Sequence, residues 1–281
     1  MSNGIAGIDH IIVGVRDLEA ARLRWMRLGF TLTPRGRHIG QGTANYCIMF
    51  GRDYLELLGF VERDEHAHRL EAFLVGREGA MSMAFAPERN AEATTALLAA
   101  RGLHPSAPRA LGRALELPEG AVTPRFSLLT LPPEETPALD CFICGHLTPE
   151  LVRRPEWLVH PNGVTGIAAV HLVVDDPAAL VPAYRRLFGN GRVATTVRGV
   201  EIDTGRNRLV FSRPALSGSD IPPPAIIALE LRVANGTATA GYLTSAGIAF
   251  MELPDGRIAI SPAEANGTSL LLTENEIEFP P

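Results

Sequence analysis

The chain has 281 residues, of which 46% are hydrophobic, and 26 basic side chains set against 31 acidic ones give a formal net charge of −5. Every one of those basic side chains is arginine, which excludes Schiff-base lysines and a phosphate-loop lysine. The acidic balance, without runs of like charge, argues against nucleic acid and anionic membranes as partners and favours a small molecule. No signal-peptide pattern or 18-residue apolar run occurs, so we expect a cytoplasmic protein.

Three cysteines are too few to predict a disulfide framework. Cys141 and Cys144 have the C-x-x-C spacing, but no second pair exists that would complete a zinc site. Their segment has the pattern of a strand and does not precede a helix. We therefore favour two packed core thiols over a redox pair.

Residues 8–15 carry one ionisable imidazole, His10, in an apolar run that predicts a strand. Strict alternation would place His10 on one face with Ile8 and Ile12, and Asp9 on the other face with Ile11. A sheet covered on both sides would bury His10. This residue is therefore the first one that needs a functional explanation.

The segment after this strand predicts a β-α-β-β-β unit. Asp17 can cap a helix over residues 18–28, which Gly29 ends. Further strands are expected at 31–33, 43–50 and 53–59, with residues 34–37 as a turn or wide loop between the first two.

The same unit recurs three more times, with first strands at 79–85, 167–174 and 226–233. A helical insertion at 66–75 separates the first two units. We predict an α+β fold in which four βαβββ units pair into two open, cupped mixed-sheet barrels with helices outside. The expected domains are 1–147, which would hold the site, and 164–281, which would be structural, joined by a connector at 148–163.

In its motifs the first unit resembles the vicinal oxygen chelate superfamily and, within it, glyoxalase-like proteins. The residues that carry the resemblance are Asp9-His10, Arg27-Leu28-Gly29-Phe30, Thr33 to His38, Gly42 to Asn45, Tyr54 to Leu58, and His146 to Glu150. The resemblance implies paired βαβββ units around a divalent metal held by the first and last strands of the units. It also implies reactions such as isomerisation, epimerisation, thiol transfer or ring-cleaving oxygenation, although some members only bind a drug.

By this resemblance His10 and Glu56 stand at metal-ligand positions and would suit Zn²⁺, Ni²⁺, Mn²⁺ or Fe²⁺. The alternative is a buried hydrogen-bonded pair. In the second unit Ser82 takes the place of His10, and the fourth-strand position falls at or near Cys141. His146 is then the candidate third ligand; its alternative is a loop histidine that caps the connector or contacts substrate.

Substrate contacts are expected from the segment 33–45. Arg37 could bind an anionic group, His38 could transfer a proton, and Asn45 would lie beside them; the alternative is a solvated hairpin tip. Glu56 could also act as a base. Tyr46 and Tyr54 could stack on a ligand or donate to it, although a strand tyrosine is more often part of the core or the rim.

The second half repeats the pattern less completely. His171 matches His10, but the position of Glu56 falls near Val210, which leaves Glu230 as the only further ligand. We therefore predict a structural second half. The favoured function is a glyoxalase-like metal-dependent lyase or isomerase, the alternative a non-enzymatic small-molecule binding protein, and extradiol-type oxygenation the least supported. A homodimer is compatible with the resemblance.

Overall fold

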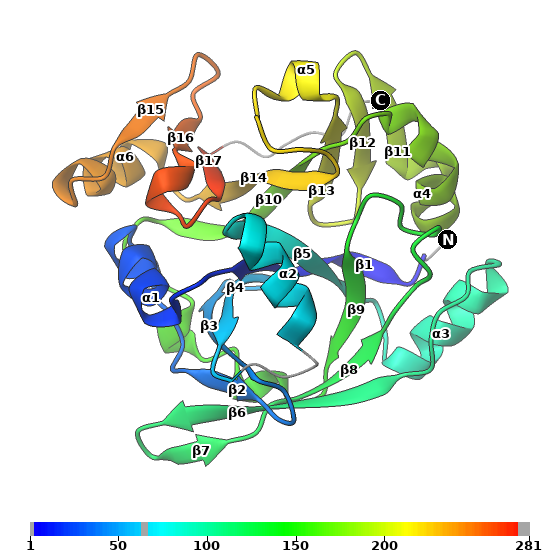
Figure 1. Ribbon diagram of the computed structural model, residues 1–281, viewed down its shortest axis with the longest axis horizontal. Coiled ribbons are helices and arrows are strands. Elements are labelled where there is room, and N and C mark those ends of the chain that lie inside the picture. Colours follow the sequence, from blue (N-terminus) through cyan, green and yellow to red (C-terminus); the bar gives the residue numbers. More distant parts are fainter. Residues whose placement is uncertain (1–2, 63–66, 275–281) are drawn as a thin grey trace.

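The computed structural model describes residues 3–62 and 67–274. Its elements follow the fourfold repeat of a strand, a helix and further strands (Figure 1). The first half contains β1 (Ile5–Gly14), α1 (Leu18–Arg27), β2 (Gly36–His38), β3 (Thr43–Met49), β4 (Tyr54–Phe60), α2 (His68–Gly76), β5 (Gly79–Pro87), α3 (Ala91–Ala100), β6 (Arg109–Leu117), β7 (Gly120–Val122), β8 (Arg125–Leu129) and β9 (Cys141–His146).

Two short 3₁₀ turns, Pro149–Leu151 and Pro155–Trp157, connect the halves. The second half contains β10 (Val164–Val173), α4 (Val181–Phe188), β11 (Val193–Thr196), β12 (Gly199–Asp203), β13 (Arg208–Ser212), α5 (Pro214–Ser217), β14 (Ala225–Val233), α6 (Gly236–Ser245), β15 (Phe250–Glu252), β16 (Ile258–Ile260) and β17 (Ser269–Thr273).

The helix after the first strand of each unit begins at an Asp or Asn whose side chain accepts a hydrogen bond from the first turn. Asp17 accepts from the Ala20 amide, Asn90 from Ala93 and Asn235 from Ala238. Asp176 does the same at the 3₁₀ turn that leads into α4. These local caps explain why the helix starts could be read from the sequence.

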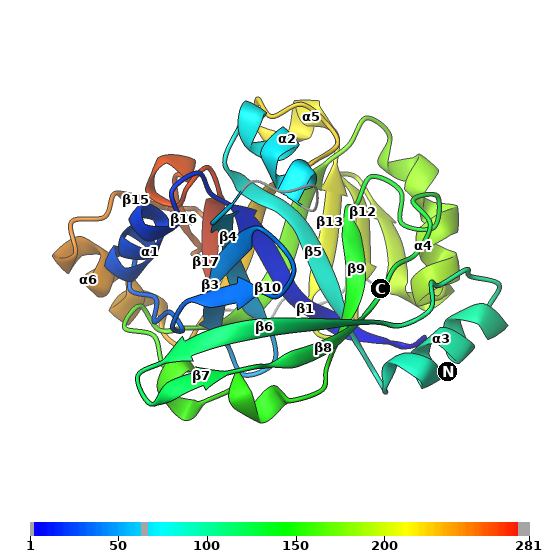
Figure 2. The same cartoon turned by 60° about the horizontal axis from the view of Figure 1, so that its bottom comes forward.

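The first sheet closes on itself. Its strand order is β2-β3-β4-β1-β5-β9-β8-β6-β7, and β2 also pairs with β6. The first two units therefore share one barrel, joined where β1 runs antiparallel to β5. Figure 2 shows β6 and β8 crossing the front of this barrel. We expected an open barrel, and the β2–β6 pairing is what closes it.

The predicted strand at 31–33 does not form. Within that segment, Thr33 alone hydrogen-bonds to β3, with its amide to the Cys47 carbonyl and its hydroxyl to the Cys47 amide. The strand lies instead where we expected a turn, with Gly36 opposite Leu115 and Arg37 opposite Ala114 of β6. Pairing with β6, which is distant in sequence, decided the position of this strand.

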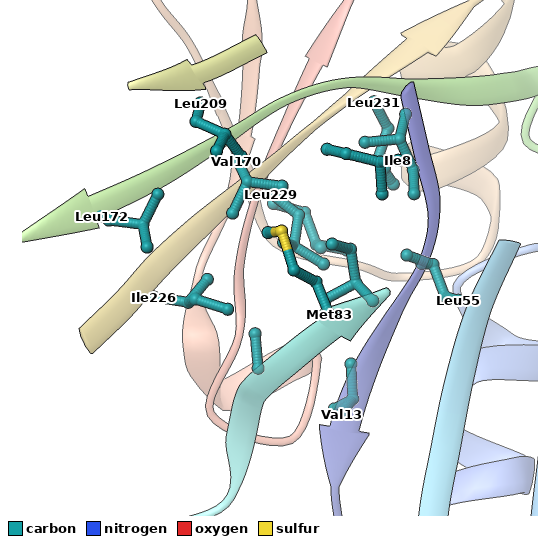
Figure 3. Packing of buried hydrophobic residues seen from close by; sticks show 14 of the residues in the cluster. Ile8, Val13, Leu55, Met83, Val170, Leu172, Leu209, Ile226, Leu229 and Leu231 are labelled. Carbon is teal, nitrogen blue, oxygen red and sulfur yellow. The ribbon is translucent and has the colours of Figure 1, made fainter. Parts of the chain in front are cut away.

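The second sheet stays open, with the order β11-β12-β13-β10-β14-β17-β16-β15. It packs face to face against the first sheet, with Ile8, Val13 and Met83 opposite Val170 and Leu229 (Figure 3). Helix α1 lies beside α6 and α3 beside α4, so the helices flank the packed sheets (Figure 1). One continuous hydrophobic core therefore joins the two halves.

Buried hydrogen bonds join the two halves, and each half contributes the same kind of contact: a side chain just before a strand accepts from a backbone amide of the other half. Asp53, just before β4, accepts a hydrogen bond from the Ile167 amide, and Asn207, just before β13, accepts one from the Ile8 amide. The Asn207 amide also donates to Asp53 over 3.2 Å. Burial raises the pKa of Asp53 to about 6, against the hydrogen bonds that lower it.

Within the described ranges, no helix combines the length and the apolar character needed to cross a membrane.

Candidate functional site

A β-bulge at Asp9 shapes the site. The register of β1 against β5 shifts between Ile8, opposite Phe85, and His10, opposite Ala84. Ile8 therefore enters the core between the sheets, and the expectation that it shares a face with His10 is wrong. The extra residue brings the Asp9 carboxylate to 2.7 Å from His10 Nδ1, so Asp9 does not lie on the opposite face from His10.

The closed barrel encloses a cavity of about 470 Å³, which we call the first cavity. Strands β1 to β6, β8 and β9 contribute to its wall, together with Arg69 and Leu70 of α2. Much of the wall is apolar, as small-molecule sites usually are. Five polar or charged residues of the wall carry the chemistry considered below: His10, His38, Asn45, Glu56 and Arg113.

Glu56 lies at the centre of this polar group and is 5% exposed. The Asn45 amide donates to its Oε1 over 2.5 Å, while His10 Nε2 is 3.6 Å from Oε2 and His38 Nε2 is 3.6 Å from Oε1. Burial by itself raises the pKa of Glu56, but His38, His10, the Asn45 hydrogen bond and Arg113 together lower it. Glu56 is therefore a carboxylate at neutral pH.

Both imidazoles are held through Nδ1 and leave Nε2 directed at Glu56. Asp9 holds His10, whose ring also stacks on Tyr54 at 4.4 Å between centroids. The Thr43 hydroxyl is 2.9 Å from Nδ1 of His38. Burial lowers the pKa of His38, which keeps its imidazole neutral.

Arg113 of β6 is a member of the site that the sequence analysis missed. Its side chain is buried, with the residue 3% exposed, and its Nη1 donates to Cys47 Sγ over 2.8 Å. Gly36 leaves the space for it, because a Cβ there would lie 2.7 Å from Arg113 Cδ and 2.4 Å from Asn45 Oδ1. The sequence carried little signal for it, because β6 also contains Arg109 and Glu116. Only the β2–β6 pairing brings Arg113 into the cavity wall, where its charge lowers the pKa of Glu56.

His146 does not join His10 Nε2 and Glu56, as we expected of a third ligand. The bulge places Asp9 between the two imidazoles, and His146 Nε2 is 3.1 Å from Asp9 Oδ2. His146 instead lines a second cavity of about 390 Å³ with Asp9 and Cys144. Ligand atoms of these three residues lie within 4.8 Å of one another.

The register of β9 also corrects the expected counterpart of Glu56. Ala84 is opposite Phe142 as His10 is opposite Tyr54, so the residue two positions on is Cys144, and not Cys141. Cys144 lines both cavities. Burial raises the pKa of Cys141 to about 11, and it also raises the pKa of Cys144 well above the ordinary value, so neither thiol ionises readily.

The predicted substrate residues divide between the two faces of their strands. His38, Asn45 and Tyr54 line the first cavity. Arg37 is exposed outside it, because alternation along β2 points Arg37 away from the side that His38 faces. Tyr46 packs in the core, where its hydroxyl donates to Glu19 of α1.

A family model described as a glyoxalase-like domain matches residues 8–188. The chain belongs to this glyoxalase-like family. The family and the structural neighbours place it in the vicinal oxygen chelate superfamily, whose members include metal-dependent isomerases and dioxygenases. No curated protein matches the chain.

Solved structures share the whole fold of this glyoxalase-like chain at low identity. A hypothetical protein from Staphylococcus aureus has a TM-score of 0.68 at 14% identity, covering 95% of this chain and 98% of its own. A mutant of 4-hydroxymandelate synthase from Streptomyces coelicolor has a TM-score of 0.56 at 13% identity, covering 98% and 94%. A fusion protein of a xylose isomerase-like TIM barrel and 4-hydroxyphenylpyruvate dioxygenase has a TM-score of 0.58 at 13% identity, covering 98% of this chain and 50% of its own.

Superfamily relatives use divalent metals, and the donors in the first cavity of this glyoxalase-like chain fit such an ion. Two imidazoles and a carboxylate form a donor set that divalent transition metals bind. His10 Nε2 is too far from Glu56 for a hydrogen bond, and the carboxylate on its Nδ1 is the usual support of a metal-bound histidine. His10, His38 and Glu56 are therefore one set of residues that could hold a metal. Asp9, Cys144 and His146, whose ligand atoms lie within 4.8 Å of one another, are the other candidate set among the described residues.

Proposed function

We propose that the first cavity is the active site of a metal-dependent lyase or isomerase that acts on a small carbonyl- or oxygen-rich molecule. The observation that supports this most is the buried Glu56 carboxylate, with a fixed imidazole 3.6 Å from each of its oxygens. Carboxylates and neutral imidazoles are the groups that move protons near pH 7.

The walls define how a substrate would lie. Leu58, Met81 and Leu128 would contact its apolar part. Its oxygens would face the side of the cavity that carries Glu56, where Arg113 provides a permanent positive charge. Asn45 Oδ1 is buried without a hydrogen-bond partner and could accept from a substrate hydroxyl.

A divalent ion held by His10, His38 and Glu56 would polarise a substrate carbonyl and make a proton on the adjacent carbon easier to remove. Glu56 takes that proton, and the Asn45 hydrogen bond fixes the orientation of its carboxylate. His38 can accept or return a proton at the neighbouring position only when its Nε2 is not bound to the ion, because its Nδ1 is held by Thr43. Returning the proton to the adjacent carbon completes an isomerisation without any net gain or loss of protons.

Metal analysis by mass spectrometry tests the proposal. Wild type, His10→Ala and His171→Ala would be purified without chelator or affinity metal. We expect about one equivalent of a first-row metal in wild type and in His171→Ala, and its loss from His10→Ala. α-Ketoaldehydes and their thiol adducts would then be screened as substrates. Equal metal content in His10→Ala and wild type would contradict the proposed ligand set.

A non-enzymatic small-molecule binding protein is the second candidate. The observation in its favour is that Arg113 already supplies a buried positive charge that acts on Glu56, while Ala84 of β5, opposite His10, offers no metal ligand. A metal-free preparation that binds an apolar ligand tightly without turnover would select this function. A homodimer and a cytoplasmic location stay predictions.

A further inference from the structure

The second cavity, of about 390 Å³, has an unusual concentration of arginines. Arg52, Arg89, Arg153 and Arg206 line it, and they come from four segments far apart in the sequence. Arg206 belongs to the turn between β12 and β13 of the second half, so the cavity lies where the two halves meet. Its volume is within the range of small-molecule sites, about 300–1,000 Å³.

The positive charge of this cavity is largely unbalanced. Asp9 is the one carboxylate among the described residues of its wall, and His10 and His146 already bind it. Arg153 is held by the carbonyls of Phe50 and Arg52 and lies 3.8 Å from Asp9. Within the described ranges, the structure gives the Arg52, Arg89 and Arg206 side chains no carboxylate partner, although the chain as a whole carries a net charge of −5.

A second observation in the same cavity also indicates a missing ligand. The His146 side chain is 10% exposed, and its Nε2 faces Asp9. Its Nδ1 is buried and has no hydrogen-bond partner. An unsatisfied buried polar atom is costly, so a ligand that hydrogen-bonds to Nδ1 would stabilise the protein.

These features together select one ligand chemistry. Three arginines without carboxylate partners suit an anion with several oxygens, which guanidinium groups bind through paired hydrogen bonds. The buried Nδ1 of His146, which has no hydrogen-bond partner, is a further polar atom for such a ligand to contact. A phosphate group can make all of these contacts at once, because its several oxygens can each meet a different side chain.

We propose that the second cavity binds the phosphate group of a small molecule. Arg52, Arg89 and Arg206 bind the phosphate oxygens, and His146 Nδ1 hydrogen-bonds to the same group. Arg153 and Asp9 complete the wall of the second cavity. The site stands on residues of the second cavity alone, so it does not depend on the reaction proposed for the first.

Isothermal titration calorimetry at constant ionic strength tests the proposal, with inorganic phosphate and phenyl phosphate as probes. Arg89→Gln/Arg206→Gln removes two of the three arginines that have no carboxylate partner. The matched control, Arg185→Gln/Arg198→Gln, removes the same charge from exposed positions that line neither cavity. Wild type should bind one equivalent of at least one probe, and affinity should fall about tenfold for each cavity arginine removed.

The control variant should stay within about twofold of wild type, since screening limits long-range charge effects at physiological salt. Tighter binding of phenyl phosphate would assign the site to the phosphate end of a larger molecule, and tighter binding of inorganic phosphate to the free ion. Absence of binding to wild type, or an equal loss of affinity in the control, would overturn the proposal. Melting curves establish that each variant is folded.

Discussion

The two halves use the same unit, but only the first closes around its histidine. In the first half, β2 pairs with β6, and His10 and Glu56 both line the first cavity, with His10 Nε2 3.6 Å from Glu56 Oε2. In the second half the sheet stays open, and His171 Nε2 lies 2.9 Å from Glu230. A histidine and a glutamate on neighbouring strands are thus not sufficient for a site.

The difference lies in what else each carboxylate contacts. Arg257, itself bound to Asp255, lies 3.4 Å from Glu230, so that carboxylate is paired with the imidazole and a guanidinium. Glu56 has one direct hydrogen bond, from Asn45. His10 and Glu56 therefore keep atoms available to bind a metal or a substrate, whereas His171 and Glu230 do not. This contrast supports our prediction that the second half is structural.

Replacing the two glutamates tests this contrast most strongly. Glu56→Gln removes the proposed base and a metal ligand, so we expect a loss of turnover of about 10²–10⁴-fold. Glu230→Gln should leave turnover within about twofold of wild type, since it lies outside the first cavity. Steady-state kinetics and metal content would be measured on both. A comparable loss in the two variants would contradict a single site in the first half.

The next largest effect, on stability, is expected from the buried Asp53 and Asn207 side chains that join the two halves. Asn207→Asp would set a second carboxylate against the buried Asp53 and remove a donor to it. We expect a loss of about 3–5 kcal/mol in the free energy of unfolding at pH 7, as for other uncompensated buried charges. Urea denaturation measures it. The exchange variant Asp53→Asn/Asn207→Asp restores one carboxyl and one amide and should recover about half of the loss, roughly 2 kcal/mol.

Asp53 should also make stability depend on pH. Its pKa is raised to about 6 in the folded state against an ordinary value of 3.8, so the unfolded chain releases this proton first. The contribution of Asp53 to the free energy of unfolding should therefore be greatest below pH 4, fall between pH 4 and 6, and level off above, by on the order of 3 kcal/mol. Denaturation across this window checks the sign. If Asp53→Asn keeps the same slope, another group is responsible.

The smallest expected effect comes from the space that Gly36 leaves beside Glu56. A Cβ at this position would collide with Asn45 and Arg113, so Gly36→Ala should lower the free energy of unfolding by about 1–3 kcal/mol. It should also weaken ligand binding in the first cavity. Gly191→Ala, where a Cβ meets nothing within 4 Å, is the matched control in the second half. Equal stability of the two variants would show that the β2–β6 contact adjusts without cost.

The sequence by itself determined the repeat of units and the starts of their helices, because capping side chains and period-two patterns act over a few residues. It also placed His10 and Glu56 on strands of one unit, and the motifs around them indicated the superfamily. The sequence also showed that the second half has a histidine on its first strand, His171, and too few further metal ligands. Both follow from residue identity alone.

Only the tertiary structure decided which side chains meet. The bulge at Asp9 depends on the register of β1 against β5, and it separates His146 from Glu56. The pairing of β2 with β6 brings His38 and Arg113 into the cavity and leaves Arg37 outside. Both are contacts between segments more than 70 residues apart. The physical reason is that local patterns set the faces of a strand, whereas its register is chosen by the packing of distant strands.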